Sequence, residues 1–183
     1  EVLAKGLRRY GKDFIHKLDG MYAIAWYDKV DQTLLFARDT AGAKPFFVYR
    51  ENDILAFSSS IKSLAAYGVN LQLPKGYIQE RVERGSMSGT RTLYRNISKL
   101  YPGQIIKYRL HNLSKELDEH AHKKIQLIDT ELGDIELYQY LYDTCRGAIS
   151  GSVKSCLMGK RRMGLYLSGG LDSSIVLHEA VKH

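Results

Sequence analysis

The stretch Gly164-Leu165-Tyr166-Leu167-Ser168-Gly169-Gly170-Leu171-Asp172-Ser173-Ser174 decides the fold of the C-terminal part of the chain. It begins as a short apolar strand, predicted at 163–167, turns at two glycines and continues into an apolar run that opens a second helix from about Asp172. Helix, strand, glycine loop and helix in this order open an α/β domain. The first of these helices is predicted upstream, from apolar residues at helical spacing: Ile135, Tyr138, Leu141, Tyr142, Cys145, Ile149, Val153 and Cys156.

The glycine loop has the composition of an anion-binding site. Gly169 and Gly170 can adopt conformations that turn several backbone N–H groups toward one point. The helix that follows presents its own unpaired N–H groups and its positive dipole end to the same place. Hydroxyl donors are added by Ser168, Ser173 and Ser174. The loop matches neither the Walker pattern nor the dinucleotide fingerprint. A structural turn rich in Gly and Ser is the plainer alternative.

Asp172 is an acidic residue inside this predicted anion site. It would repel phosphate unless a cation lay between them, so it suggests Mg²⁺ held jointly with a polyphosphate. A helix N-cap is the alternative role for this residue.

The N-terminal part of the sequence predicts mostly strands. A helix with apolar residues from Leu7 to Leu18 is expected to end near Gly20. Strands are then expected at 21–28, 33–39, 45–50 and 54–58 as an antiparallel meander, followed by a short helix at 59–67 and a last strand at 104–110. The first two strands are almost continuously apolar, which predicts a sheet covered on both faces.

The charge-rich segment 111–133 has little periodicity and is predicted to connect two domains. The chain is therefore divided into residues 1–110, 111–133 and 134–183. His120 and His122 lie beside Asp118 and Glu119 in this segment and could bind a metal, but a solvated polar run is the favoured interpretation. Cys145 and Cys156 would lie roughly 16 Å apart on a helix, so we expect reduced, half-buried core thiols and no disulfide between them.

Composition excludes several classes of protein. With 44% hydrophobic and 26% charged residues, the chain is expected to be folded and globular. The net charge is +7, but scattered basic residues favour a solvated or phosphate-facing surface over a nucleic-acid footprint. No apolar run approaches the roughly 18 residues of a membrane span, so a cytoplasmic location is expected. The chain begins with Glu1 and ends at His183 inside a predicted helix, so we expect a piece of a longer protein.

The glycine loop resembles the pyrophosphate loop (PP-loop) of the N-type ATP pyrophosphatases, in its asparagine synthetase version. The N-terminal part is similar to the class II glutamine amidotransferase domain in the order and spacing of residues 19–23, Asp28, 37–47 and 57–64, with 93–94 and 100–103 matching a later loop and strand. Ser60 and residues 79–89 depart from the family pattern. The resemblance, to the glutamine-hydrolysing asparagine synthetase family, covers nearly the whole chain.

This resemblance implies an α+β fold, with a β-rich, Ntn-hydrolase-like amidotransferase part of layered antiparallel sheets followed by the start of an α/β PP-loop synthetase domain. It implies ATP-dependent conversion of aspartate and glutamine to asparagine and glutamate, with AMP and pyrophosphate as products and β-aspartyl-AMP as intermediate. ATP and Mg²⁺ would be required, with Mg²⁺ at Asp172. The residues implied to bind ATP and pyrophosphate are Leu167, Ser168, Gly169, Gly170, Asp172, Ser173 and Ser174.

The resemblance assigns no glutaminase catalytic residue, because the N-terminal cysteine nucleophile of the family is absent from these residues. The chain alone is therefore expected to be inactive. Glutamine and aspartate are the expected partners, without nucleic acid or membrane, and a homodimer is left open. Three alternatives stay open: a relative acting on another acid, such as a β-lactam synthetase or sugar amidotransferase, an RNA-modifying PP-loop ATPase, and a non-catalytic remnant.

Overall fold

The computed structural model describes residues 1–121, 133–159 and 162–183. The chain forms two compact units, Glu1–Lys124 and Ile125–His183. The described elements confirm the predicted α+β class. The first unit contains, in chain order, α1 (Val2–Tyr10), the 3-10 helix η1 (Gly11–Lys17), β1 (Ala23–Asp28), β2 (Thr33–Arg38), β3 (Phe47–Glu51), β4 (Ile54–Ser58), α2 (Ile61–Tyr67), α3 (Lys75–Arg84), β5 (Ile97–Lys99), β6 (Gln104–Arg109) and β7 (Ser114–His120).

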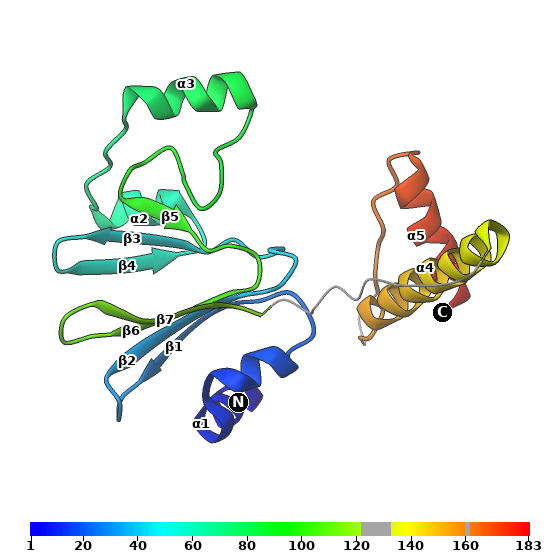
Figure 1. Ribbon diagram of the computed structural model, residues 1–183, viewed down its shortest axis with the longest axis horizontal. Coiled ribbons are helices and arrows are strands. Elements are labelled where there is room, and N and C mark those ends of the chain that lie inside the picture. The colour runs from blue at the N-terminus through cyan, green and yellow to red at the C-terminus, as the bar shows by residue number, and fades with distance from the viewer. Residues whose placement is uncertain (122–132, 160–161) are drawn as a thin grey trace. The chain divides into compact units, whose positions relative to one another are not determined.

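Two antiparallel sheets are stacked in the first unit (Figure 1). The strand order is β1-β2-β6-β7 in the first sheet and β4-β3-β5 in the second. Between them lies a buried cluster to which both sheets contribute: Phe36, Phe46, Val48, Leu100, Ile106 and Tyr108. A second cluster packs α1 and η1 on the outer face of the first sheet, and a third packs α2 on the outer face of the second. The result is a helix–sheet–sheet–helix layering.

β2 contributes side chains to the buried clusters on both of its faces, and its sequence Thr-Leu-Leu-Phe-Ala-Arg shows why. Alternate side chains of a strand point to opposite faces. Phe36 enters the cluster between the sheets, whereas Leu35 and Ala37 enter the cluster under α1 and η1. The prediction that both faces are covered is therefore right for β2. It is wrong for β1, an edge strand that buries Ile24 but exposes Tyr27.

The predicted meander is also wrong at one connection. β2 pairs with β6, in the register Phe36↔Ile106, and β3 starts the other sheet. A loop at 39–46 redirects the chain between the two layers. Hydrophobic patterning cannot show which strands become neighbours. The predicted single helix from Leu7 to Leu18 is divided at Gly11, whose φ of 56° ends α1 and starts η1.

β7 extends the β-rich part beyond residue 110, where the sequence analysis ended it. Ser114–His120 pairs with β6 although it carries four charged side chains and Leu117 as its only large apolar one. Charged residues are common on edge strands, where one side of the strand meets water. The rest of the predicted connection, from residue 122 to 132, lies outside the described residues.

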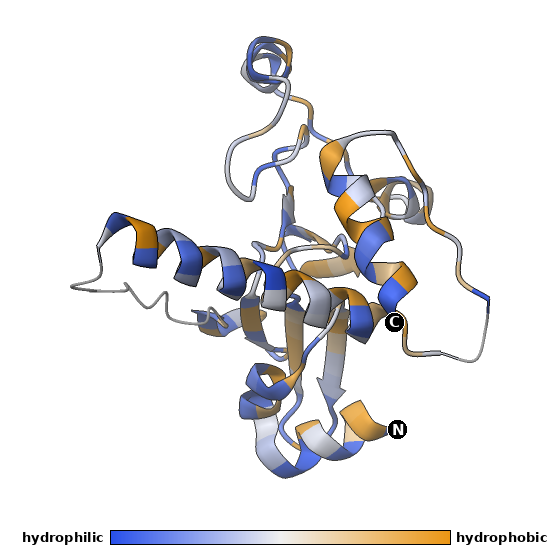
Figure 2. Cartoon of the chain, turned by 90° about the vertical axis from the view of Figure 1, so that its right-hand side faces the viewer, coloured by the Kyte–Doolittle hydropathy of each residue, from blue (hydrophilic) through white to orange (hydrophobic). Residues whose placement is uncertain are grey.

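The described part of the second unit consists of α4 (Asp134–Cys156) and α5 (Leu171–Lys182). Figure 2 shows hydrophobic residues recurring along both helices. The strand predicted at 163–167 is not formed, because the described residues provide no neighbouring strand with which it could pair. Cys145 and Cys156 are free, as predicted, but exposed instead of half-buried, since α4 has no buried residue. Among the described residues, no helix is long and apolar enough to cross a membrane.

Candidate functional site

The glycine loop at 168–170 is a tight turn that leads directly into α5. Gly169 has a φ of 81°, a left-handed conformation that side chains with a Cβ rarely adopt. Gly170 is extended, with φ −80° and ψ 167°, and is the N-cap of α5. The turn therefore depends on glycine at 169, and it places the start of the helix immediately after the loop.

Three serines converge on this turn, as the sequence analysis expected. The Ser168 and Ser173 hydroxyl oxygens lie 3.0 Å apart, and the Gly170 amide donates to Ser168 Oγ at 3.3 Å. The Ser173 and Ser174 hydroxyls donate to the Gly170 carbonyl oxygen at 3.1 and 2.8 Å. All these groups are exposed, so the hydroxyls can turn toward a ligand when one binds.

The start of α5 supplies further donors. The first amides of a helix have no intrahelical partner and carry the positive end of the helix dipole. Asp172 lies in this first turn, and Leu167 precedes the loop with half of its surface exposed. A cradle of amides and hydroxyls fits a polyphosphate, and a carboxylate beside it fits a cation shared with that phosphate. The capping alternative for Asp172 does not apply, since Gly170 occupies the N-cap.

A buried carboxylate lies on α5 behind the loop, and the sequence analysis missed it. Glu179 is only 5% exposed and accepts a hydrogen bond from Lys182 Nζ at 2.5 Å. Hydrogen bonds from Lys182 and from the Ser150 hydroxyl of α4 hold the pKa of Glu179 below its usual value. Ser150 Oγ also lies 3.0 Å from His183 Nε2. The hydropathy pattern of α5 gives no signal for a buried acid, because its partner Ser150 is remote in sequence.

In the first unit, the loop after β2 is held by the side chains of Arg38 and Asp39. Arg38 donates to the carbonyl oxygens of Gly42, Lys44 and Leu100, each at 2.6 Å. The loop also needs glycine at 42, where φ is 65° and an added Cβ would lie 2.9 Å from Pro102 Cγ. Arg38 and Asp39 thus each bind backbone groups of the loop.

Asp39 is almost fully buried, with 1% of its surface exposed. Its carboxylate accepts the Ala43 amide at 2.8 Å and the Lys44 amide at 3.0 Å. Burial opposes ionisation, but the hydrogen bonds from the Lys44 and Ala43 amides outweigh it and hold the pKa of Asp39 below its usual value. This residue shapes the loop and is not available to a ligand.

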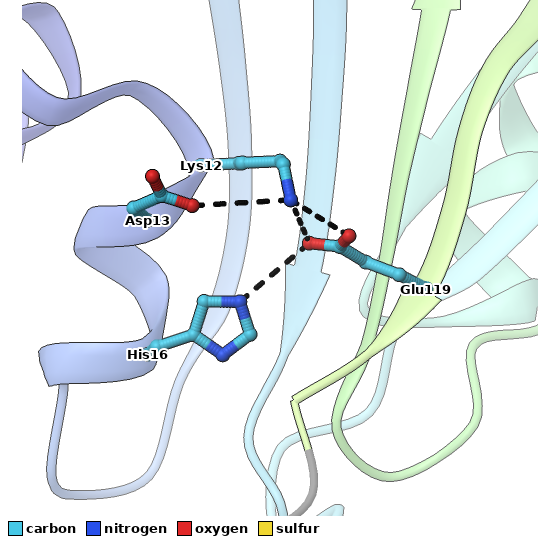
Figure 3. Close-up of polar contacts among 4 residues, drawn as sticks. All are labelled: Lys12, Asp13, His16 and Glu119. Carbon is cyan, nitrogen blue, oxygen red and sulfur yellow. Dashed lines mark hydrogen bonds and ion pairs between the residues drawn. The ribbon is translucent and has the colours of Figure 1, made fainter.

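Figure 3 shows a polar cluster that joins η1 to β7. Lys12 Nζ lies 2.9 and 2.8 Å from the two carboxylate oxygens of Glu119 and 3.8 Å from Asp13. His16 Nε2 lies 3.5 Å from Glu119 Oε1. The hydrogen bond to Glu119 raises the pKa of Lys12. The sequence analysis could not pair these residues, because Lys12 and Glu119 are 107 positions apart.

The metal site considered at 118–122 is not formed by the described residues. His120 and Glu119 lie on β7, and His122 lies outside the described part. No group of three or more His, Cys, Asp or Glu among residues 1–121, 133–159 and 162–183 is arranged to hold a metal ion. Asp118 instead accepts hydrogen bonds from Gln104 and Lys115.

Comparisons with known proteins match both parts of the chain. A family model described as a glutamine amidotransferase domain matches residues 1–129, and one described as asparagine synthase matches residues 144–183. A putative glutamine-hydrolysing asparagine synthetase 2 of Methanocaldococcus jannaschii is 30% identical over 97% of this chain and 34% of its own length. Glutamine-hydrolysing asparagine synthetase 1 of Bacillus subtilis is 28% identical, over 98% of this chain and 27% of its own length.

Another relative carries a different name. Amidase chry2 of Gibberella zeae is 24% identical over 96% of this chain and 25% of its own length. The chain thus spans about a quarter to a third of the length of these relatives. The resemblance to glutamine-hydrolysing asparagine synthetases is confirmed, and, because the amidotransferase model matches more than half of the sequence, this chain belongs to the glutamine amidotransferase domain family.

Proposed function

We propose that the intact protein makes an amide from a carboxylic acid, with glutamine as the nitrogen donor and ATP as the activating substrate. The proposed acid is aspartate, so that asparagine, glutamate, AMP and pyrophosphate are the products. The observation that carries the proposal is the donor cradle of residues 168–174 at the start of α5, in a chain whose first unit belongs to an amidotransferase family. Both the family match to residues 144–183 and the names of the relatives support it.

In the proposed chemistry, ATP gives the carboxylate a better leaving group. An oxygen of a carboxylate is too poor a leaving group for ammonia to displace. Attack of the aspartate side-chain carboxylate on the α-phosphorus of ATP forms β-aspartyl-AMP and releases pyrophosphate. Ammonia released from glutamine then attacks the acyl carbon, AMP leaves and a proton passes to solvent or a nearby base. Negative charge accumulates on the departing pyrophosphate during the first step, which is where prepositioned donors lower the barrier most.

In this proposal each residue of the loop has a role toward ATP. Ser168, Ser173 and Ser174 donate hydroxyl hydrogen bonds to the pyrophosphate, and the amides of Gly169 and Gly170 add to the same cradle. Backbone groups near Leu167 face the adenine. Mg²⁺, when bound, would neutralise phosphate charge, and Asp172 is the residue of the loop that offers it a carboxylate.

The division into an amidotransferase part, a connection and a synthetase part from residue 134 belongs to this proposal. The connection starts after β7 and not at residue 111, because β7 pairs with β6 in the first sheet. So do the cytoplasmic location and the inactivity of the 183-residue chain by itself. Relatives named amidase chry2 and amidase chyE favour, as a second candidate, the same amide chemistry on another acid.

The test is to express the longer protein that contains this chain and to incubate it with glutamine, aspartate and ATP. We expect asparagine, with AMP and pyrophosphate formed in equal amounts. Formation of ADP and phosphate would contradict activation by adenylation. AMP formed with other acids but not with aspartate would favour the second candidate.

A further inference from the structure

A pocket of about 400 Å³ in the first unit is lined by two cationic side chains, Arg38 and Lys99. Arg38 is the last residue of β2, Lys99 is the last residue of β5, and Tyr101 lines the pocket just after β5. Met87 and Gly89, from the segment between α3 and β5, also line it. Pockets of this size hold small molecules. None of the described residues that line it is acidic, so its wall carries positive charge without a compensating carboxylate.

Arg38 is held rigidly and keeps donors for a ligand. A guanidinium has five N–H groups, and three of those of Arg38 donate to the carbonyl oxygens of Gly42, Lys44 and Leu100, each at 2.6 Å. Within the described chain, the other two N–H groups have no protein acceptor. Asp39 interacts electrostatically with Arg38, but it does not line the pocket and both of its oxygens already accept amides. A ligand can therefore use the remaining donors of a cation whose position is fixed.

Lys99 and Tyr101 are likewise fixed in place and keep unused donors. The Lys99 amide donates to the Thr90 carbonyl oxygen at 2.8 Å, and the Tyr101 amide donates to Gln104 Oε1 at 2.9 Å. The ring of Tyr101 packs edge-on against that of His120, with centroids 5.9 Å apart. Among residues 1–121, 133–159 and 162–183, no carboxylate pairs with Lys99 and no group bonds the Tyr101 hydroxyl. An ammonium and a phenol are thus available to a ligand in the pocket.

Two glycines keep these donors uncovered. Gly89 has a φ of 63°, and an added Cβ would lie 2.7 Å from the Tyr101 hydroxyl oxygen. Gly42 has a φ of 65°, and an added Cβ would lie 3.2 Å from Arg38 Cζ. A backbone that approaches this closely, in conformations that favour glycine, leaves no side chain to cover the guanidinium or the phenol.

We propose that this pocket binds the phosphate group of a small molecule. A guanidinium offers a planar fork of donors and an ammonium a compact point charge, and both are common partners of phosphate. Three donor groups on three side chains suit the three outer oxygens of a phosphate monoester better than the two oxygens of a planar carboxylate. Met87 and Pro102 line the same pocket and offer apolar surface to the rest of a small ligand. The inference goes beyond the proposed function, because this pocket lies in the first unit and the loop at 168–170 in the second.

The experiment titrates the ¹⁵N-labelled 183-residue chain separately with phenyl phosphate, inorganic phosphate and acetate. The ionic strength is held constant at about pH 7.5, where phosphate groups are mostly dianionic. The ¹⁵N–¹H NMR signals of the Gly42 and Gly89 amides report on the pocket. Those of Gly169 and Gly170 report on the loop in the same titration, so binding at the two places is read separately.

Two variants remove pocket donors without touching Arg38, which also holds the loop after β2. Lys99→Met removes the ammonium, and Tyr101→Phe removes the hydroxyl but keeps the ring that packs against His120. The matched control is Lys62→Met, which removes an exposed cation of α2 that does not line the pocket.

We expect saturable shifts of the Gly42 and Gly89 signals with both phosphates. Lys99→Met should raise the Kd at least about tenfold, because a charge-assisted hydrogen bond is lost, and Tyr101→Phe about threefold, because a neutral one is lost. Lys62→Met should match the wild-type chain. Tighter binding of phenyl phosphate supports a ligand that extends over the apolar wall, and equal Kd values for the two phosphates support free phosphate as the ligand.

Three results would overturn the proposal. They are the absence of saturable shifts at Gly42 and Gly89 at millimolar phosphate, Kd values unchanged by both pocket variants, and tighter binding of acetate than of inorganic phosphate. Phosphate-induced shifts confined to Gly169 and Gly170 would place the anion at the loop alone, which overturns this inference and leaves the proposed function standing. If Lys99→Met fails to fold, Tyr101→Phe decides alone.

Discussion

Replacing Asp39 by asparagine is the sharpest test of the loop that joins the two sheets. The substitution keeps the shape of the side chain but turns one acceptor oxygen into an NH₂ group, which then faces the amide of Ala43 or Lys44. One charge-assisted hydrogen bond is lost and one amide is left without its acceptor. Hydrogen bonds to charged groups contribute about 1.5–3 kcal/mol, and an unsatisfied buried group costs about 1–3 kcal/mol. We expect the free energy of unfolding to fall by about 2–4 kcal/mol, because these contributions overlap.

The matched control is Asp28→Asn. Asp28 also accepts two backbone amides, from Val30 at 2.9 Å and Asp31 at 3.3 Å, but in an exposed turn where water replaces a lost partner. We expect it to cost less than about 1 kcal/mol. Urea unfolding followed by circular dichroism measures both, with the m-value checking that the folded and unfolded states are comparable. Equal losses at the two positions would refute the argument that burial makes Asp39 decisive.

Protonation of Asp39 should have the same effect as Asp39→Asn. The pKa of Asp39 is lower in the folded chain than in the unfolded one. The stabilisation by its carboxylate is therefore complete above the unfolded pKa of about 3.9 and is lost as pH falls through the folded value. Acid titration of the wild-type chain and of Asp39→Asn should therefore converge at low pH, and parallel curves would contradict this. Phe36→Ala should cost about 3–5 kcal/mol in urea unfolding, because it leaves a cavity between the two sheets. Lys12→Met should cost no more than about 1 kcal/mol, since the side chain is 41% exposed. Its effect should disappear at high pH as wild-type Lys12, whose pKa is raised, also loses its charge. In the longer protein, Asp172→Asn should abolish ATP-dependent turnover, measured as AMP release, and unchanged turnover would remove Asp172 from the mechanism.

The strands and their burial were predictable wherever a local pattern determines them. The run at 33–38 is apolar at successive positions, and it becomes the strand that is buried on both faces. By contrast, β7 was missed because its stability comes from pairing with β6 and not from its own apolar residues. The pairing of β2 with β6 was missed for the same reason: strand order depends on contacts between residues about 70 positions apart, which no local period reveals.

In the second unit, local patterns predicted a strand and buried side chains that the structure does not have. The pattern at 163–167 is that of a buried strand, yet these residues are exposed and form no strand, because a strand forms only against a neighbour. The cysteines of α4 followed the apolar stripe as predicted, but that stripe remains open to solvent in this unit. The convergence of the loop serines was predictable from spacing alone, since residues that flank a glycine turn must lie near it. The buried Glu179 was not, because charge ordinarily indicates exposure.

Binding of pyrophosphate to the wild-type chain and to Gly169→Val tests the central claim most directly. Valine cannot adopt the φ of 81° found at this position without strain, so the substitution should disrupt the cradle and leave the first unit intact. Titration calorimetry with magnesium pyrophosphate should give saturable binding to the wild-type chain and at least about tenfold weaker binding to the variant. Equal affinities, or no binding to the wild-type chain, would contradict the assignment of residues 168–174 as the site that holds pyrophosphate.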